Sequence, residues 1–207
     1  MLTFVTIGQS PRSDVIPELI DIIGKSFEYK EIGLLDFPEN LQSLKLLNIE
    51  SGEEFLVSRL RDGEEVKMPR EWVVQKLNEI VPEIEEFKVL LCTENFDLPN
   101  LILPVKILES FVSILKPKKL GVVVPAKGQI DMVKNKWERL VEDLKITYFS
   151  PYSTESGDLS VLNDRELIVL DCIGYGKKDE NYLRSYTGGI VVSARRLLAN
   201  FLRNNIL

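Results

Sequence analysis

The chain has 207 residues, of which 44% are hydrophobic and 28% are charged, and this composition is typical of a globular protein with a sizeable core rather than a disordered one. The net charge is −6 and the basic residues are interleaved with acidic ones, which argues against nucleic acid as a partner. The chain has no histidine, which excludes Ser-His and Cys-His nucleophile pairs and imidazole zinc sites. Any acid–base catalysis must therefore use Cys, Asp, Glu, Lys or Tyr side chains.

The first residues, MLTFVTIGQSPR, have no basic segment ahead of an apolar stretch, and no apolar run approaches the roughly 18 residues that span a bilayer. We therefore expect no signal peptide, no membrane partner and a cytoplasmic location. In that compartment two cysteines are expected to be free thiols. Without histidine they do not complete a structural zinc site, so we expect no metal.

The N-terminal half alternates short β-branched runs with longer amphipathic segments, which predicts an α/β protein with parallel strands. Ser13 is expected to cap the first helix and Gly24 to end it. The pair Asp62-Gly63 between two extended runs predicts a hairpin. The expected strands are 2–8, 27–35 and 88–92, and the expected helices are 14–24, 41–47 and 69–87.

The C-terminal half repeats this alternation. Its expected strands are 119–125, 145–150, 166–172 and 189–193, and the expected helices are 103–116, 128–144 and 194–205. We predict two α/β halves, residues 1–105 together with 191–207, and residues 118–190, with the last helix packing back on the first half.

The two cysteines, Cys92 and Cys172, each end an apolar strand, one in each half. Ligands bind at the carboxyl ends of strands in open parallel sheets, so two thiols at matching positions are candidate catalytic groups. A thiolate on one face of a bound acid could remove its α-proton while a thiol on the other face returns one, provided that one thiol pKa is lowered. The alternative is that both are ordinary buried cysteines.

Donors for a substrate carboxylate are available close to both cysteines. After the first cysteine they are the side chains of Thr93 and Asn95, and after the second they are the backbone amides of Ile173 and Gly174. Asp171, directly before Cys172, would tend to raise the pKa of that thiol unless it is paired.

The segment TIGQSPRSD lies at the first strand–helix turn, where α/β proteins bind anionic groups. Gln9, Ser10 and Arg12 are therefore candidate carboxylate ligands, and Arg12 could grip a carboxylate in bidentate fashion. The alternative is that the serines only cap the helix and Arg12 is a surface charge. The segment is neither a P-loop nor a dinucleotide fingerprint, so we expect no cofactor.

Several segments together resemble the AroM family: TIGQSPRSDVIPEL, RLRDGEEVKMPREWV, LGVVVP, LDCIGYG and VVSARRLLAN. This family is similar in turn to the aspartate/glutamate/hydantoin racemase superfamily. The resemblance covers nearly the whole chain and implies two pseudo-symmetric halves, an active site between them with one cysteine from each half, and a homodimer. The chain departs from the amino-acid racemases after Cys92, where Thr-Glu-Asn replaces Asn-Thr, and around Cys172, which is preceded by Asp171 and not by glycine.

We therefore predict a cofactor-independent racemase- or isomerase-like protein that transfers a proton at the α-carbon of a small carboxylate, with Cys92 and Cys172 as the acid–base groups. The alternative is a non-catalytic metabolite-binding or regulatory protein with the same fold. A third interpretation, thiol redox sensing, requires the two thiols to approach disulfide distance. The thiol pKa values distinguish the first two, because catalysis needs one of them lowered.

Overall fold

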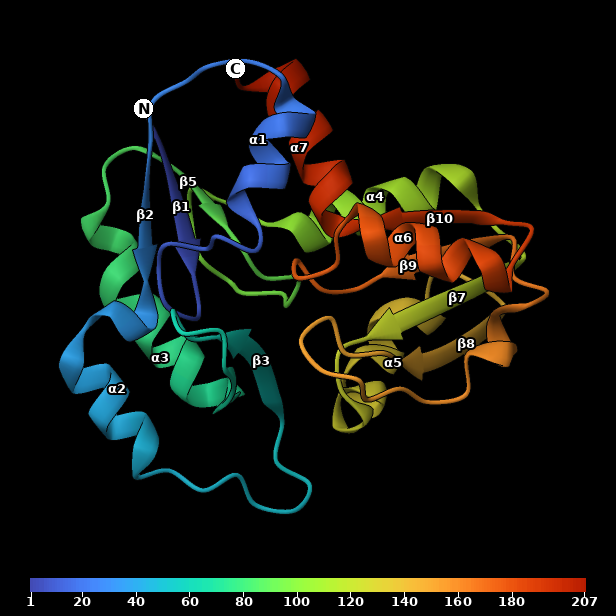
Figure 1. The fold of residues 1–207 in the computed structure, drawn as a ribbon, viewed down its shortest axis with the longest axis horizontal. Helices are drawn as coiled ribbons and strands as arrows, with labels where there is room; N and C mark the ends of the chain where they lie inside the picture. Colours follow the sequence, from blue (N-terminus) through green and yellow to red (C-terminus); the bar gives the residue numbers. More distant parts are fainter.

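The computed structural model describes residues 1–207 and contains two parallel four-stranded sheets side by side, which confirms the predicted α/β fold with two halves (Figure 1). The first sheet has the order β2-β1-β5-β6 and the second the order β10-β9-β7-β8. The strands of the first sheet are β1 (Leu2–Thr6), β2 (Tyr29–Gly33), β5 (Phe87–Leu90) and β6 (Leu101–Ile102). Those of the second are β7 (Lys119–Val124), β8 (Asp143–Tyr148), β9 (Leu167–Leu170) and β10 (Ile190–Ser193).

The two sheets have the same topology. If the sheet strands of each half are counted in chain order, both sheets read 2-1-3-4, with all pairs parallel. The central strands are buried on both faces, as the continuous apolar run of β7 shows. Equivalent strand ends in the two halves therefore carry equivalent loops.

Six of the seven helices follow the predicted order with shifted ends, whereas α6 (Lys177–Leu183) was not predicted. α1 (Ile16–Ile23) begins after Val15 with no side-chain cap, so the prediction that Ser13 caps it is wrong, whereas Gly24 ends it as predicted with φ +65°. α3 (Arg70–Ile80) passes into a 3-10 turn that contains Pro82. None of the helices is long and apolar enough to cross a membrane. The remaining helices are α2 (Pro38–Lys45), α4 (Pro104–Leu115), α5 (Ile130–Glu138), α6 (Lys177–Leu183) and α7 (Ala194–Asn205).

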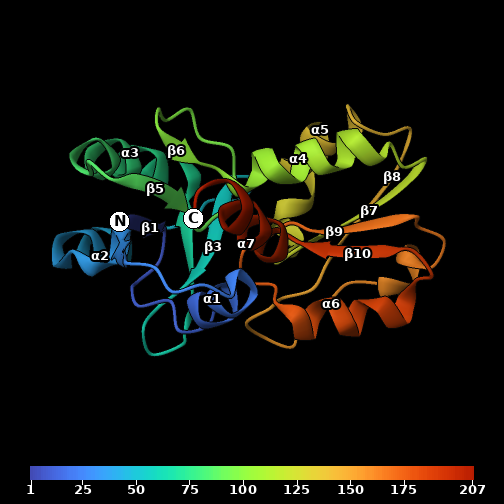
Figure 2. The same cartoon turned by 90° about the horizontal axis from the view of Figure 1, so that it is seen from above.

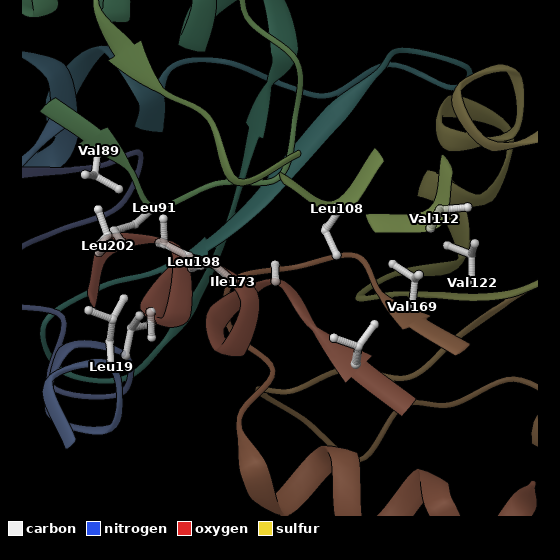
Figure 3. Packing of buried hydrophobic residues seen from close by; sticks show 14 of the residues in the cluster. Leu19, Val89, Leu91, Leu108, Val112, Val122, Val169, Ile173, Leu198 and Leu202 are labelled. Carbon is white, nitrogen blue, oxygen red and sulfur yellow. The ribbon is translucent and has the colours of Figure 1, made fainter. Parts of the chain in front are cut away.

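Helix α7 lies between the two halves and contacts both α1 and α4, and α4 covers a face of the second sheet (Figures 1 and 2). In the core, Leu202 of α7 lies beside Leu19 of the first half, whereas Val112 of α4 lies near Val122 and Val169 of the second sheet (Figure 3). The last helix of the first half, α4, thus packs against the second half, and the last helix of the second half, α7, packs against the first. One apolar cluster of 23 buried residues extends through both halves. Residues 191–193, which we assigned to the first half, pair within the second sheet.

The predicted hairpin is formed by β3 (Phe55–Arg59) and β4 (Glu65–Pro69), which pair antiparallel. Gly63 in its turn has φ +100°, a conformation that glycine adopts without strain. The hairpin belongs to the first half but reaches the second, because the Gln129 side-chain amide donates to the Phe55 carbonyl at 3.1 Å. It therefore forms one wall of the space between the halves.

Candidate active site

The two thiols occupy equivalent places in the two halves. Cys92 lies two residues beyond the end of β5 and Cys172 two residues beyond the end of β9, and these are the third sheet strands of their halves. Each sulfur accepts a hydrogen bond from the backbone N–H two residues later, that of Glu94 at 3.5 Å and that of Gly174 at 3.4 Å. Both cysteines are free and both line the same cavity between the halves.

The cavity walls come from both halves. The hairpin supplies Leu56, Val57 and Ser58, and α5 supplies Met132 and Lys136. The space is about 30 Å³, which is room for about two water molecules. A small carboxylate therefore enters only when the walls move apart.

Hydrogen bonds join the two halves on the hairpin side of the cavity. Across the two halves, Gln129 donates to Phe55 at 3.1 Å, the Ser150 hydroxyl donates to the Glu65 carboxylate at 3.3 Å, and the Lys136 ammonium donates to the Thr93 carbonyl at 3.4 Å. A neutral hydrogen bond contributes only about 0.5–1.5 kcal/mol net to stability. Opening of the hairpin side is therefore compatible with an intact core.

Of the residues predicted from the sequence, the structure brings Arg12, Thr93 and Ile173 into the cavity lining together with both cysteines. Gly174 is not part of this lining, but its backbone N–H donates to the Cys172 sulfur at 3.4 Å.

Three predicted ligands lie outside the cavity lining and bind other parts of the first half. The Gln9 side chain donates to the Leu35 carbonyl at 3.0 Å and accepts from the backbone of Arg61. The Ser10 hydroxyl donates to the Asp36 carboxylate at 2.7 Å. Asn95 is exposed and its carbonyl accepts from Arg70. None of the three lines the cavity, and Gln9 and Ser10 are bound to other loops through their side chains, so we leave Gln9, Ser10 and Asn95 out of the binding set.

Arg12 is buried, with 2% of its surface exposed, and is not the solvated surface charge of the alternative interpretation. Its guanidinium makes a bidentate pair with Asp14, with both N–O distances 2.8 Å. The remaining N–H groups donate to Thr6 at 2.9 Å, to Tyr152 at 3.3 Å and to Ser58 at 3.4 Å. A substrate carboxylate can bind Arg12 only by replacing the two longest of these bonds.

The sequence did not identify Tyr152 as a candidate site residue, because it lies in a polar segment whose composition is typical of a connecting loop. Its hydroxyl accepts from Arg12 at 3.3 Å, and Tyr152 lines the same cavity as Cys172, so it links the first half to the part of the second half that holds this thiol. A methyl group on Gly174 would collide with this hydroxyl, so the glycine leaves the space that Tyr152 fills.

Arg195 explains why a cation stands in the first turn of α7, where the helix dipole disfavours it. The buried guanidinium donates to the carbonyls of Ile173 and Gly174 at 2.8 to 3.2 Å and pairs with Glu18 at 2.9 Å. It therefore fixes the turn that follows Cys172.

Asp171 is paired, which resolves the question raised by its position next to Cys172. Its Oδ2 lies 2.6 Å from the Lys136 ammonium and accepts from the Trp137 indole at 2.8 Å. The side chain of Asp171 is 1% exposed and that of Lys136 is 13% exposed, so this is a nearly buried ion pair at the cavity wall.

Burial dominates the acidity of both thiols. It raises the pKa of Cys92 to about 12 and that of Cys172 to about 11, from an ordinary value of 9.0. The N–H groups of Glu94 and Gly174 lower these pKa values by less than burial raises them. In the closed cavity both groups are therefore neutral thiols near pH 7, and the lowered thiol pKa that catalysis needs is not present in this closed state.

Two α/β halves of the same strand order with a cavity between them give a fold similar to those of racemase and isomerase enzymes. An allantoin racemase from Pseudomonas fluorescens superposes with a TM-score of 0.54 at 12% identity, over 97% of this chain and 88% of that chain. A maleate isomerase from Pseudomonas putida S16, solved with maleate, superposes with a TM-score of 0.50 at 12% identity, over 98% of this chain and 91% of that chain. At such low identity these similarities show the fold alone.

The family follows from the sequence as a whole. The family model for AroM protein matches residues 2–206, so the chain belongs to the AroM family, as its motifs predicted. A search of curated proteins gives no match.

Proposed function

We propose that this AroM-family protein catalyses cofactor-independent proton transfer at the α-carbon of a small carboxylate, most simply a racemisation, with Cys92 and Cys172 as the acid–base groups. The observation that carries the proposal is the placement of the thiols. The two halves have the same strand order, each half has its cysteine after the third sheet strand, and both cysteines line one cavity. Isomerisation through the same α-proton transfer belongs to this proposal, as does decarboxylation, in which a C–C bond breaks with release of CO2 and a thiol then protonates the carbanion.

In the proposed racemisation, one cysteine is a thiolate and takes the α-proton, so that a C–H bond breaks and an S–H bond forms. The electron pair passes into the substrate carboxylate. The other cysteine, a thiol, gives its proton to the opposite face, which forms a new C–H bond and leaves that sulfur as the thiolate. Atoms and charge balance, and the reverse reaction restores the first protonation state.

The raised thiol pKa values place a condition on this chemistry. Opening of the cavity rehydrates the sulfurs and removes the main cause of the shift, so the thiolate forms in the open state and closure follows substrate binding. Thr93 beside Cys92, the Lys136 ammonium and Arg12 are the lining groups that would stabilise the carboxylate as its negative charge grows.

The same pKa values favour a second candidate, a metabolite-binding protein that uses the cavity without turnover. A binder needs no thiolate, and two thiols of raised pKa are inert at neutral pH. Both candidates place a small carboxylate at the same site. A binding measurement therefore does not distinguish them, whereas a measurement of α-proton exchange does.

The test is proton exchange in D2O, followed by NMR, together with optical rotation, over separate enantiomers of amino acids and hydantoins; substituted malonates, which are achiral, are tested for exchange alone. Wild type is compared with Cys92→Ala and Cys172→Ala. If the proposal holds, wild type exchanges and inverts the α-centre. Each single variant loses inversion, and the thiol that it keeps still exchanges the proton of one enantiomer only, a different one in each variant. Ligand-induced thermal stabilisation without exchange would instead identify the binding protein.

A further inference from the structure

Two buried oxygens of the cavity wall have no hydrogen-bond partner, namely Oε1 of Gln129 and Oδ1 of Asp171. The two residues are 7% and 4% exposed, and both line the cavity that contains the thiols. Buried side-chain oxygens in folded proteins are nearly always hydrogen bonded, because an unsatisfied acceptor retains the full cost of its desolvation. Two of them on one cavity wall therefore indicate a ligand that brings hydrogen-bond donors.

Each oxygen is held in place by the rest of its own side chain. The Gln129 amide nitrogen donates to the Phe55 carbonyl at 3.1 Å, and only the nitrogen can face a carbonyl, so the orientation of the amide is fixed. In Asp171 the other oxygen forms an ion pair with the Lys136 ammonium and accepts a hydrogen bond from the Trp137 indole. Neither acceptor can turn to another partner without breaking these bonds.

We propose that Gln129 and Asp171 recognise an N–H group, such as an ammonium, amide or ureido group, on the small carboxylate that binds between the thiols. The inference rests on the proposed function for the position of the ligand. Two acceptors require two hydrogens, which an ammonium or a ureido group supplies and a hydroxyl does not. The negative charge of Asp171 disfavours a second carboxylate there, while the adjacent Lys136 ammonium suits the carboxylate of the same ligand.

The proposal assigns Gln129 and Asp171 as specificity-determining residues. A site built to accept hydrogen bonds rejects an analogue without the donor, because its buried acceptors then stay unpaired. A hydrogen bond to a charged group corresponds to about a 10- to 100-fold difference in affinity.

The test is calorimetric titration with two pairs of isosteric carboxylates that differ only in the N–H group. The first pair is N-carbamoylglycine and levulinate, in which NH2 and NH are replaced by CH3 and CH2. The second pair is L-aspartate and the methylsuccinate enantiomer of the same shape, in which NH3⁺ is replaced by CH3. Wild type is compared with Gln129→Met, which keeps the length of the side chain and removes the acceptor, and with Gln129→Glu, which restores one.

We expect at least one N–H compound to bind wild type about 10-fold or more tightly than its isostere. Gln129→Met should reduce this preference and Gln129→Glu should recover it. Equal affinities within both pairs, an undiminished preference in Gln129→Met, or no binding by any of the four compounds at millimolar concentration would overturn the inference.

The outcome is independent of turnover. N–H selectivity without α-proton exchange supports this recognition and refutes the proposed catalysis. Conversely, exchange of carboxylates that lack an N–H group, with affinities that do not distinguish the pairs, supports the catalysis and refutes the recognition.

Discussion

The acidity of the two thiols can be measured directly, and the structure predicts slow alkylation near neutral pH. At pH 8 a thiol of pKa 9.0 is about 10% thiolate, whereas a thiol of pKa about 11 is about 0.1% thiolate. Cys172 should therefore react about 100-fold more slowly than an ordinary thiol, and Cys92, with a pKa of about 12, about 1,000-fold more slowly.

The assay is the rate of iodoacetamide alkylation between pH 7 and 11, followed by mass spectrometry. Cys92→Ser and Cys172→Ser each leave a single thiol to follow. The rate should rise about tenfold per pH unit up to the pKa of the remaining thiol. The same variants unfolded in guanidinium provide the matched control, in which both thiols should level off near pH 9.

The shape of the pH profile separates acidity from access. A narrow cavity slows alkylation by one factor at every pH, whereas a raised pKa moves the plateau. A plateau below pH 9 for either thiol in the folded protein would refute the argument that burial dominates, and it would supply the lowered pKa that the proposed catalysis requires.

Three further predictions concern stability. Lys136→Met should destabilise the protein by about 3 kcal/mol in urea unfolding because it leaves the Asp171 carboxylate buried without its cation, and Lys136→Met combined with Asp171→Asn should recover part of that loss. If the single variant unfolds like wild type, the pair contributes nothing. Gly174→Ala should cost about 1 to 3 kcal/mol because its methyl group displaces Tyr152, whereas Gly188→Ala, with open space around it, should be near neutral; equal effects would contradict the packing of Tyr152. The folded-state pKa values of the thiols are raised, so their stabilising contribution is complete below pH 9 and is lost as the pH rises toward 11, by about 1.4 kcal/mol per pH unit for each thiol. Unfolding free energies measured across this range in wild type and in the cysteine-to-serine variants test it, and identical slopes in all of them would contradict it.

The framework of the fold was predictable because its signals are local. Apolar runs of four to seven residues, the glycine at position 24 and the Asp62-Gly63 turn predict strands, a helix end and a hairpin, and the structure contains all of them. The thiols could be placed for the same reason, because a cysteine that ends a central parallel strand must lie at the carboxyl edge of its sheet. Helix ends were less predictable, as the uncapped start of α1 at Ile16 shows.

Which side chains face the cavity was decided by packing between segments far apart in the chain. Gln9 and Ser10 lie at the turn where anions usually bind. Their side chains instead donate hydrogen bonds to the Leu35 carbonyl and the Asp36 carboxylate. Tyr152 carries no local signal, and it reaches Arg12 only because the two sheets lie side by side.

The sequence by itself determined the α/β class, the two halves, the family and the strand-end positions of the two cysteines, since these depend on residue order and hydrophobic period. Only the tertiary structure decided that Lys136 neutralises Asp171, that two oxygens of cavity-lining residues are unpaired, and that the surroundings raise the pKa of both thiols. The pKa of a thiol, and whether an oxygen finds a hydrogen-bond donor, depend on the atoms within a few ångströms. Those atoms are brought together by the packing of the two halves.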